Sequence, residues 1–151
     1  MINHNIDRIP ILRLDYSEDE IEFIQSGIAE IMKSGYLTMH DKVREFETKF
    51  SNFVGVKYAI GVNSGTSALE IPLRALKVEG KSVIVPTNTF MATPLAVIHA
   101  GAKVIFVDVS PFDLSIDPFD LKRKIRHDSV AVIAVHIGGI ISSHWQEIQN
   151  I

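Results

Sequence analysis

Small and hydroxylated side chains are concentrated at residues 61–69, where the sequence reads Gly-Val-Asn-Ser-Gly-Thr-Ser-Ala-Leu. This run joins an apolar segment to an amphipathic one, as a turn between a strand and a helix does. The first N–H groups of a helix have no intrahelical partner, and the helix dipole places partial positive charge beside them. A phosphate on Gly65, Thr66 and Ser67 would therefore meet ready hydrogen-bond donors. The alternative is that Ser64 or Thr66 only caps the helix.

Two further turns could build one site with this phosphate cradle. In open α/β sheets, ligands bind beyond the carboxyl ends of the strands. The turns at that edge follow the strands expected at 57–62, 82–86 and 130–135. The second turn contains Asn88 and Phe90, and the third contains His136. An aromatic ring near a phosphate cradle suggests a planar, phosphorylated ligand, although Phe90 could instead fill the core and His136 could be a structural histidine.

The elements that would position these residues alternate along the second part of the chain. Residues 82–86 and 103–107 are apolar, β-branched runs, and residues 130–135 are apolar at every position, as in a strand covered on both faces. A capping aspartate followed by proline at 117–118 is typical of a helix start, and this helix is expected to run to about Arg126. Strands that alternate with helices predict an α/β fold with a mostly parallel sheet flanked by helices.

The first part of the chain is expected to be helical after an extended arm at residues 1–16. Ser17 and Glu20 are spaced as a capping box, and the helix that follows should end at Gly35. A second helix is expected at about 41–55. It should bury the apolar residues Val43, Phe46, Phe50 and Phe53.

Two local features have more than one interpretation. The loop between these helices carries Tyr36 and Thr38, which either face solvent or line a pocket. Pro72 lies inside the helix after the phosphate cradle, where it removes a backbone hydrogen bond, so this helix is either kinked or starts later. The apolar stripe expected on that helix consists of Leu69, Leu73 and Leu76.

Composition limits the classes of protein to which the sequence can belong. The 151 residues suffice for one domain with a core, and the net charge of −3 argues against nucleic acid or an anionic membrane as the main partner. The absence of cysteine excludes disulfides, thiolate metal sites and a cysteine nucleophile. The sequence has no signal peptide, membrane-spanning run, metal-binding histidine spacing, dinucleotide fingerprint, P-loop or nucleophile elbow. We expect a soluble, cytoplasmic protein.

Across nearly its whole length, the sequence resembles the N-terminal half of the pyridoxal-phosphate-dependent sugar aminotransferases of the DegT/DnrJ/EryC1/StrS type. The segments that carry the resemblance are residues 9–11, 34–38, 53–59, 63–69, 85–93, 101–109 and 134–139. The resemblance implies that residues 17–151 form an incomplete large domain of the fold-type-I aminotransferases. It also implies pyridoxal 5'-phosphate as cofactor of the complete enzyme, with a nucleotide-linked keto sugar and an amino-acid amino donor as substrates.

The resemblance also assigns roles to individual positions. The residues expected to hold the cofactor are Gly65, Thr66, Ser67 and Phe90. The first three would bind its phosphate, and the aromatic ring would stack on its pyridine ring. The residues expected near the sugar nucleotide are Tyr36, Thr38, Asn88 and His136.

Several features depart from the family pattern. His40-Asp41 replaces Gly-Pro-like residues, and Ser142-Ser143-His144 replaces a Pro-Ala-Asp-like run. The sequence ends at Ile151, before the family's aspartate that pairs with the pyridine nitrogen and before its Schiff-base lysine. We therefore expect this chain alone to carry no covalent cofactor and to have no transaminase activity. The alternatives are a non-catalytic binding or scaffold module and an unrelated α/β phosphate-binding enzyme.

Assembly follows from the same resemblance. Similar enzymes form homodimers with active sites at the interface, whereas this chain contains only part of the large domain. Exposed strand edges and apolar helix faces favour association. We expect a homo-oligomer or an aggregation-prone chain.

Overall fold

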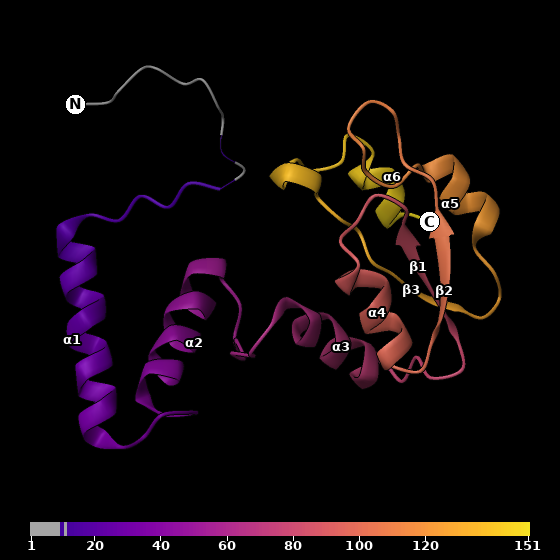
Figure 1. Ribbon diagram of the computed structural model, residues 1–151. Coiled ribbons are helices and arrows are strands. Elements are labelled where there is room, and N and C mark those ends of the chain that lie inside the picture. The colour runs from indigo at the N-terminus through magenta and orange to yellow at the C-terminus, as the bar shows by residue number, and fades with distance from the viewer. Residues whose placement is uncertain (1–9, 11) are drawn as a thin grey trace. The chain divides into compact units, whose positions relative to one another are not determined.

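The computed structural model describes Pro10 and residues 12–151. Most of the arm expected at residues 1–16 lies outside these described residues. The chain divides into two compact units, Met1–Gly61 and Val62–Ile151. The elements drawn in Figure 1 are α1 (Glu18–Ser34), α2 (Asp41–Val54), α3 (Gly65–Ala75), β1 (Ser82–Pro86), α4 (Ala92–His99), β2 (Lys103–Val107), α5 (Pro118–Lys124), β3 (Ser129–Val132), η1 (Ile137–Gly139) and α6 (Trp145–Gln149).

The helices described in the first unit begin and end where the sequence predicts. The Ser17 hydroxyl accepts a hydrogen bond from the Glu20 N–H at 3.3 Å, and the Glu20 carboxylate accepts one from the Ser17 N–H at 2.8 Å. The predicted capping box is therefore present. α1 ends at Gly35 (φ 73°) and α2 at Gly55 (φ 76°), both in the left-handed conformation that glycine adopts without steric cost.

The apolar side chains of these helices are not buried, and the prediction for α2 was wrong in this respect. Phe46, Phe50 and Phe53 expose 57%, 47% and 89% of their surface, and Val43 is half-buried. No residue of α1 is buried. Two helices offer too little surface to enclose each other's apolar faces. The amphipathic pattern therefore identifies the apolar faces but not what covers them.

The strand expected at residues 57–62 does not form, so that prediction was also wrong. The segment is described but has no regular secondary structure, and Tyr58 and Ile60 expose 74% and 77% of their surface. A strand needs a neighbour for its N–H and C=O groups, and the sheet in the described residues contains only β1, β2 and β3. The Gly61 N–H donates instead to Glu47 Oε1 at 2.8 Å.

The second unit is built on a parallel sheet of order β2-β1-β3, which confirms the predicted strand direction. β1 and β2 have the predicted bounds, and the central strand β1 is buried along its whole length. β3 is shorter than the predicted 130–135, and it leaves Val130 and Val132 42% and 38% exposed. The expected cover on both of its faces was wrong, because Ala131 packs against the core on one face while Val130 and Val132 on the other face stay partly uncovered.

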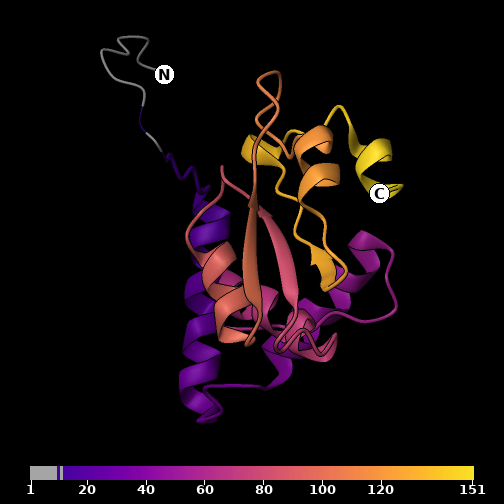
Figure 2. The same ribbon diagram turned by 90° about the vertical axis from the view of Figure 1, so that its right-hand side faces the viewer.

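Helices cover both faces of this sheet, so the second unit has three layers. On one face, Val83 of β1 packs with Leu73 of α3 and Val97 of α4. On the other face, Ile84 of β1 packs with Leu121 of α5. Figure 2 shows α4 and α5 on opposite sides of the strands. None of the helices that the structure describes is long and apolar enough to cross a membrane.

The helix after the phosphate cradle, α3, begins where the sequence predicts and continues past Pro72 to its end at Ala75. The later start that the proline suggested was therefore wrong. Leu73 is buried and Leu69 is partly buried against the core. Leu76, which was expected on the same stripe, lies just beyond the helix and is 62% exposed.

Replacing Pro72 with alanine should raise the free energy of unfolding by about 1–2 kcal/mol. Alanine restores an N–H that can donate to the carbonyl of Ala68, four residues earlier, while the more flexible unfolded chain offsets part of this gain. Thermal unfolding measures the effect. Pro94→Ala is the control, because Pro94 lies in the first turn of α4, where an N–H has no helical partner anyway. A midpoint that does not rise for Pro72→Ala would contradict the expectation.

Candidate functional site

The first turn of α3 contains a capping serine whose hydrogen bond is formed, and backbone N–H groups that remain free. The Ser64 hydroxyl accepts from the Ser67 N–H at 3.1 Å, so Ser64 is the cap, as one of the two interpretations proposed. The Ser67 hydroxyl donates to Asn63 Oδ1 at 2.8 Å. The N–H groups of Gly65 and Thr66 make no hydrogen bond to any described residue. Capping and anion binding are therefore compatible at this turn.

The charge and space around this turn suit an anion. The first turn of α3 contains no acidic residue. A Cβ added to Gly65 would meet no atom within 4 Å, so the approach to the backbone is open. Two free N–H groups, the Thr66 hydroxyl and the positive end of the helix dipole together form a donor set that fits a phosphate.

α3 and α4 pack side by side, and each leads into a strand of the parallel sheet. Arg74, in the last turn of α3, donates to the carbonyl of His99, in the last turn of α4. Glu70 accepts from Arg74 Nε at 2.7 Å and lies 3.5 Å from His99 Nδ1. The hydrogen bond from Arg74 lowers the pKa of Glu70. Because the C-terminal ends of the two helices meet, their N-terminal ends lie toward the same edge of the sheet.

Phe90 lies in the loop between β1 and α4, at that edge. Its ring is 81% exposed, so the alternative that it fills the core was wrong. Its carbonyl accepts from the Thr93 N–H at 2.9 Å, and the hydroxyls of Thr89 and Thr93 lie 2.7 Å apart. The backbone of the loop is thus fixed while the aromatic face is free to stack on a ligand.

Asn88 and His136 follow β1 and β3 at the same edge of the sheet. The Asn88 side-chain amide donates to the carbonyl of Leu114 at 3.5 Å. The exposed His136 ring meets the Trp145 ring edge-on, with centroids 5.3 Å apart and an angle of 68° between the planes. Each side chain is therefore held by a different part of the second unit.

Tyr36 and Thr38 line one hollow of about 280 Å³ in the first unit. The Tyr36 ring stacks on the His40 ring, with centroids 4.2 Å apart and planes within 4°. Lys42 Nζ and Glu30 Oε2 form an ion pair of 3.0 Å at the same hollow. Tyr36 is 62% exposed and Thr38 is exposed as well, so this loop both faces solvent and lines the hollow.

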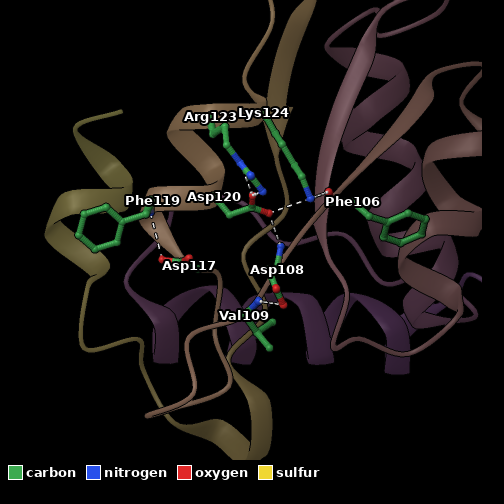
Figure 3. A network of polar contacts seen from close by, with 8 residues as sticks. All are labelled: Phe106, Asp108, Val109, Asp117, Phe119, Asp120, Arg123 and Lys124. Carbon is green, nitrogen blue, oxygen red and sulfur yellow. Dashed lines mark hydrogen bonds and ion pairs between the residues drawn. The ribbon is translucent and has the colours of Figure 1, made fainter.

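A network around Asp120 was missed from the sequence (Figure 3). The carboxylate is buried, and it accepts from the Asp108 N–H at 2.7 Å and from Arg123. Lys124 Nζ lies 2.8 Å from it, and this contact is the largest cause that lowers the pKa of Asp120. The only sequence signal was an acidic residue in the first turn of α5 followed by basic ones in its last turn. In the part of the chain that the structure describes, no three His, Cys, Asp or Glu side chains are grouped to hold a metal ion.

Known proteins resemble this chain over most of its length. The DegT/DnrJ/EryC1/StrS aminotransferase family matches residues 18–151. The spore coat polysaccharide biosynthesis protein SpsC of Bacillus subtilis is 40% identical over 74% of this chain and 29% of its own length. The dTDP-3-amino-3,6-dideoxy-alpha-D-galactopyranose transaminase of Aneurinibacillus thermoaerophilus is 36% identical over 77% of this chain and 32% of its own length.

Solved structures show the same relation. The crystal structure of NtdA from Bacillus subtilis, with bound cofactor PMP, matches with a TM-score of 0.86 at 33% identity. The match covers 98% of this chain and 35% of that structure. The chain therefore spans about a third of the length of the relatives it matches.

Proposed function

The chain belongs to the DegT/DnrJ/EryC1/StrS aminotransferase family and has part of the fold-type-I aminotransferase fold, and from this premise we propose that it forms the cofactor-phosphate site of a nucleotide-sugar aminotransferase. The observation that carries the proposal is the donor set at the first turn of α3. Gly65 and Thr66 present free N–H groups there, with no carboxylate in the turn to oppose an anion. Because the chain spans about a third of its relatives' length, transamination is proposed for the whole protein.

The residues present fit pyridoxal phosphate. Gly65 and Thr66 would hold its phosphate, and Ser67 would join them by turning its hydroxyl away from Asn63. The exposed ring of Phe90, whose carbonyl accepts a hydrogen bond from the Thr93 N–H, would supply a face for the pyridine ring. When bound, the cofactor supplies the electron sink that transfer of an amino group requires. The role of this chain is to anchor and orient that group.

The substrate side of the proposal rests on four residues, Tyr36, Thr38, Asn88 and His136. Tyr36 and Thr38 line a hollow that combines an aromatic stack with an ion pair, a chemistry that suits the base and the charged phosphates of a nucleotide. Asn88 and His136 offer polar groups at the carboxyl edge of the strands, where a sugar hydroxyl could be bound. The transaminase of Aneurinibacillus thermoaerophilus is named for a dTDP-linked amino sugar, which supports a nucleotide-linked keto sugar as the acceptor. A solved structure of GDP-4-keto-6-deoxymannose-3-dehydratase holds a trapped PLP-glutamate geminal diamine, which supports an amino acid as the donor.

Self-association belongs to the same proposal. Large apolar side chains on α1 and α2, among them Phe23 (71% exposed) and Phe53 (89% exposed), are left uncovered within the first unit. Large apolar side chains exposed in such number indicate an interaction site. We expect it to be buried in the whole protein or between its copies.

Titration with pyridoxal phosphate tests the proposal. In ¹H–¹⁵N spectra of the chain, the amides of Gly65 and Thr66 should shift most, because their N–H groups are free to bind the phosphate. Inorganic phosphate should shift the same amides and compete. Borohydride reduction should leave no single stoichiometric pyridoxyl-lysine, since none of the nine lysines lies in the sequence context of the family's lysine. The largest shifts at another site would refute the proposal, and one fully modified lysine would contradict the expectation that this chain alone carries no covalent cofactor.

A further inference from the structure

Asp113 lies in the loop between β2 and α5 and accepts four hydrogen bonds. Its Oδ1 accepts from the Ser115 N–H at 3.0 Å and from the Ser115 hydroxyl at 2.7 Å. Its Oδ2 accepts from the Ser143 N–H at 2.8 Å and from the Ser143 hydroxyl at 2.6 Å. These bonds, first of all that from the Ser115 hydroxyl, hold the pKa of Asp113 well below its usual range. The carboxylate therefore joins two segments that are 30 residues apart in sequence.

A buried contact between two serines lies beside the hydrogen bonds of Asp113. The hydroxyls of Ser115 and Ser142 lie 2.7 Å apart, and both residues are buried. The Ser142 hydroxyl oxygen accepts from the His144 N–H at 3.1 Å. We call Asp113, Ser115, Ser142 and Ser143 the Asp113 clamp. It connects the loop after β2 to the segment that leads from η1 into α6.

The clamp holds a residue in an unusual conformation. Leu114, between the two clamped residues of its loop, has φ 58°, which is the left-handed region that a bulky side chain avoids. Such a conformation persists only where the surroundings enforce it. Hydrogen bonds at Asp113 and Ser115, on both sides of Leu114, supply that enforcement, and the Leu114 N–H donates to the carbonyl of Ser110 at 2.9 Å.

The carbonyl of Leu114 is the acceptor for Asn88. The distance of 3.5 Å is at the long limit for a hydrogen bond, so a small shift of Leu114 would break it. On its other side, Ser142 of the clamp accepts a hydrogen bond from the His144 N–H. His144 is followed by Trp145, whose ring contacts His136. The Asp113 carboxylate thus affects both the carbonyl that binds Asn88 and the ring that contacts His136.

We propose that Asp113 is a positioning residue, which holds Asn88 and His136 in place at the carboxyl edge of the sheet. The substrate role of these two side chains rests on the function proposed above, but their arrangement can be measured without any ligand. In the whole enzyme, loss of the clamp would let the two polar groups move independently, and a substrate held by both would be bound less tightly.

The test is Asp113→Asn in the ligand-free chain, with Asp128→Asn as the matched control. Asparagine at position 113 has one acceptor oxygen where the carboxylate has two, so the N–H of either Ser115 or Ser143 loses its acceptor. Asp128 likewise accepts from a serine hydroxyl, that of Ser82 at 2.8 Å, but Ser82 begins β1 at the opposite edge of the sheet. Both variants lose a carboxylate–serine contact, and only one of them touches the clamp.

Two signals report the positions directly. The Asn88 side-chain amide has its own pair of resonances, and Trp145 is the only tryptophan of the chain, so its emission and acrylamide quenching report the neighbourhood of His136. In Asp113→Asn we expect shifted Asn88 side-chain resonances, stronger quenching of Trp145 and faster exchange of the Ser115 or the Ser143 amide. Asp128→Asn should leave all three signals as in the natural chain.

The milder variant Ser143→Ala keeps the result interpretable if Asp113→Asn folds poorly. It removes one donor to Asp113 and should move the same signals in the same direction by a smaller amount. If neither clamp variant moves them, or if Asp128→Asn moves them equally, the proposal is overturned and Asp113 serves only general stability. These signals are measured without a ligand and do not depend on cofactor binding at α3. The clamp can therefore be tested even if the proposed function is refuted.

Discussion

Replacing Gly65 with aspartate should weaken the binding of pyridoxal phosphate and of inorganic phosphate at least about tenfold, which corresponds to about 1.4 kcal/mol of binding free energy. The new carboxylate would lie in the first turn of α3, beside the N–H groups that we propose to bind the phosphate. Two negative charges at contact distance repel by more than this amount unless water fully screens them. Isothermal titration of the variant and of the natural chain measures the difference.

The same substitution should stabilise the protein, which separates a lost binding site from a lost fold. A negative charge at a helix N-terminus is favourable by about 0.3–1 kcal/mol, and an added Cβ at Gly65 meets no atom within 4 Å. Gly65→Asn is the control, because it adds a side chain of the same size without the charge and should lose little affinity. Equal losses for the two variants would point to steric blocking, and unchanged affinity in Gly65→Asp would remove α3 as the phosphate site.

Local signals in the sequence predict the bounds of the elements well. The Ser17–Glu20 capping box, the Asp117 cap followed by Pro118, and the glycines that end α1 and α2 act over three or four residues, so their effect does not depend on the rest of the fold. Asp117 indeed accepts from the Phe119 N–H at 3.0 Å. The strand bounds of β1 and β2 follow equally from short β-branched runs that end at a proline or a polar turn.

Burial could not be predicted in the same way, because it depends on neighbours. The periodic pattern marked Phe46 and Phe50 as one apolar face, yet both side chains stay about half exposed, at 57% and 47%. Residues 57–62 have the composition of a strand, but in the described residues no strand lies beside them. An apolar run therefore indicates that a segment can pair or pack, and the tertiary structure decides whether it does.

The candidate site was predictable where it is local and unpredictable where it is not. The donors at Gly65 and Thr66 follow from one turn, which the sequence shows directly. The Asp113 clamp joins residues about thirty positions apart, so no short motif encodes it. Two of its three serines, Ser142 and Ser143, lie within the 142–144 run that departs from the family pattern, and Ser143 donates two hydrogen bonds to Asp113.

Replacing Asp120 with alanine should lower the free energy of unfolding of the second unit by about 2 kcal/mol. The buried carboxylate is the common acceptor for the Asp108 N–H, Lys124 and Arg123. Its removal leaves the Asp108 N–H without that partner and takes a negative charge from the first turn of α5, where the helix dipole favours it. Lys124 and Arg123 still reach solvent, which keeps the loss below that of a fully buried ion pair.

The pH dependence of this loss gives a second, independent check. The folded-state pKa of Asp120 is lowered, so its contribution is fully present above the unfolded-state pKa of about 3.9 and declines as the pH falls below that value toward the folded-state pKa. The stability difference between the natural chain and Asp120→Ala should therefore be constant from pH 8 to about pH 5 and shrink below about pH 4.

Urea unfolding followed by Trp145 emission measures this stability difference in the second unit. Asp117→Ala, which removes the neighbouring cap but not this carboxylate, is the control for the loss of an acidic side chain at this helix start. A difference that grows on acidification would mean that Asp120 is stabilised in its protonated form and that the ion pair with Lys124 is not what holds it.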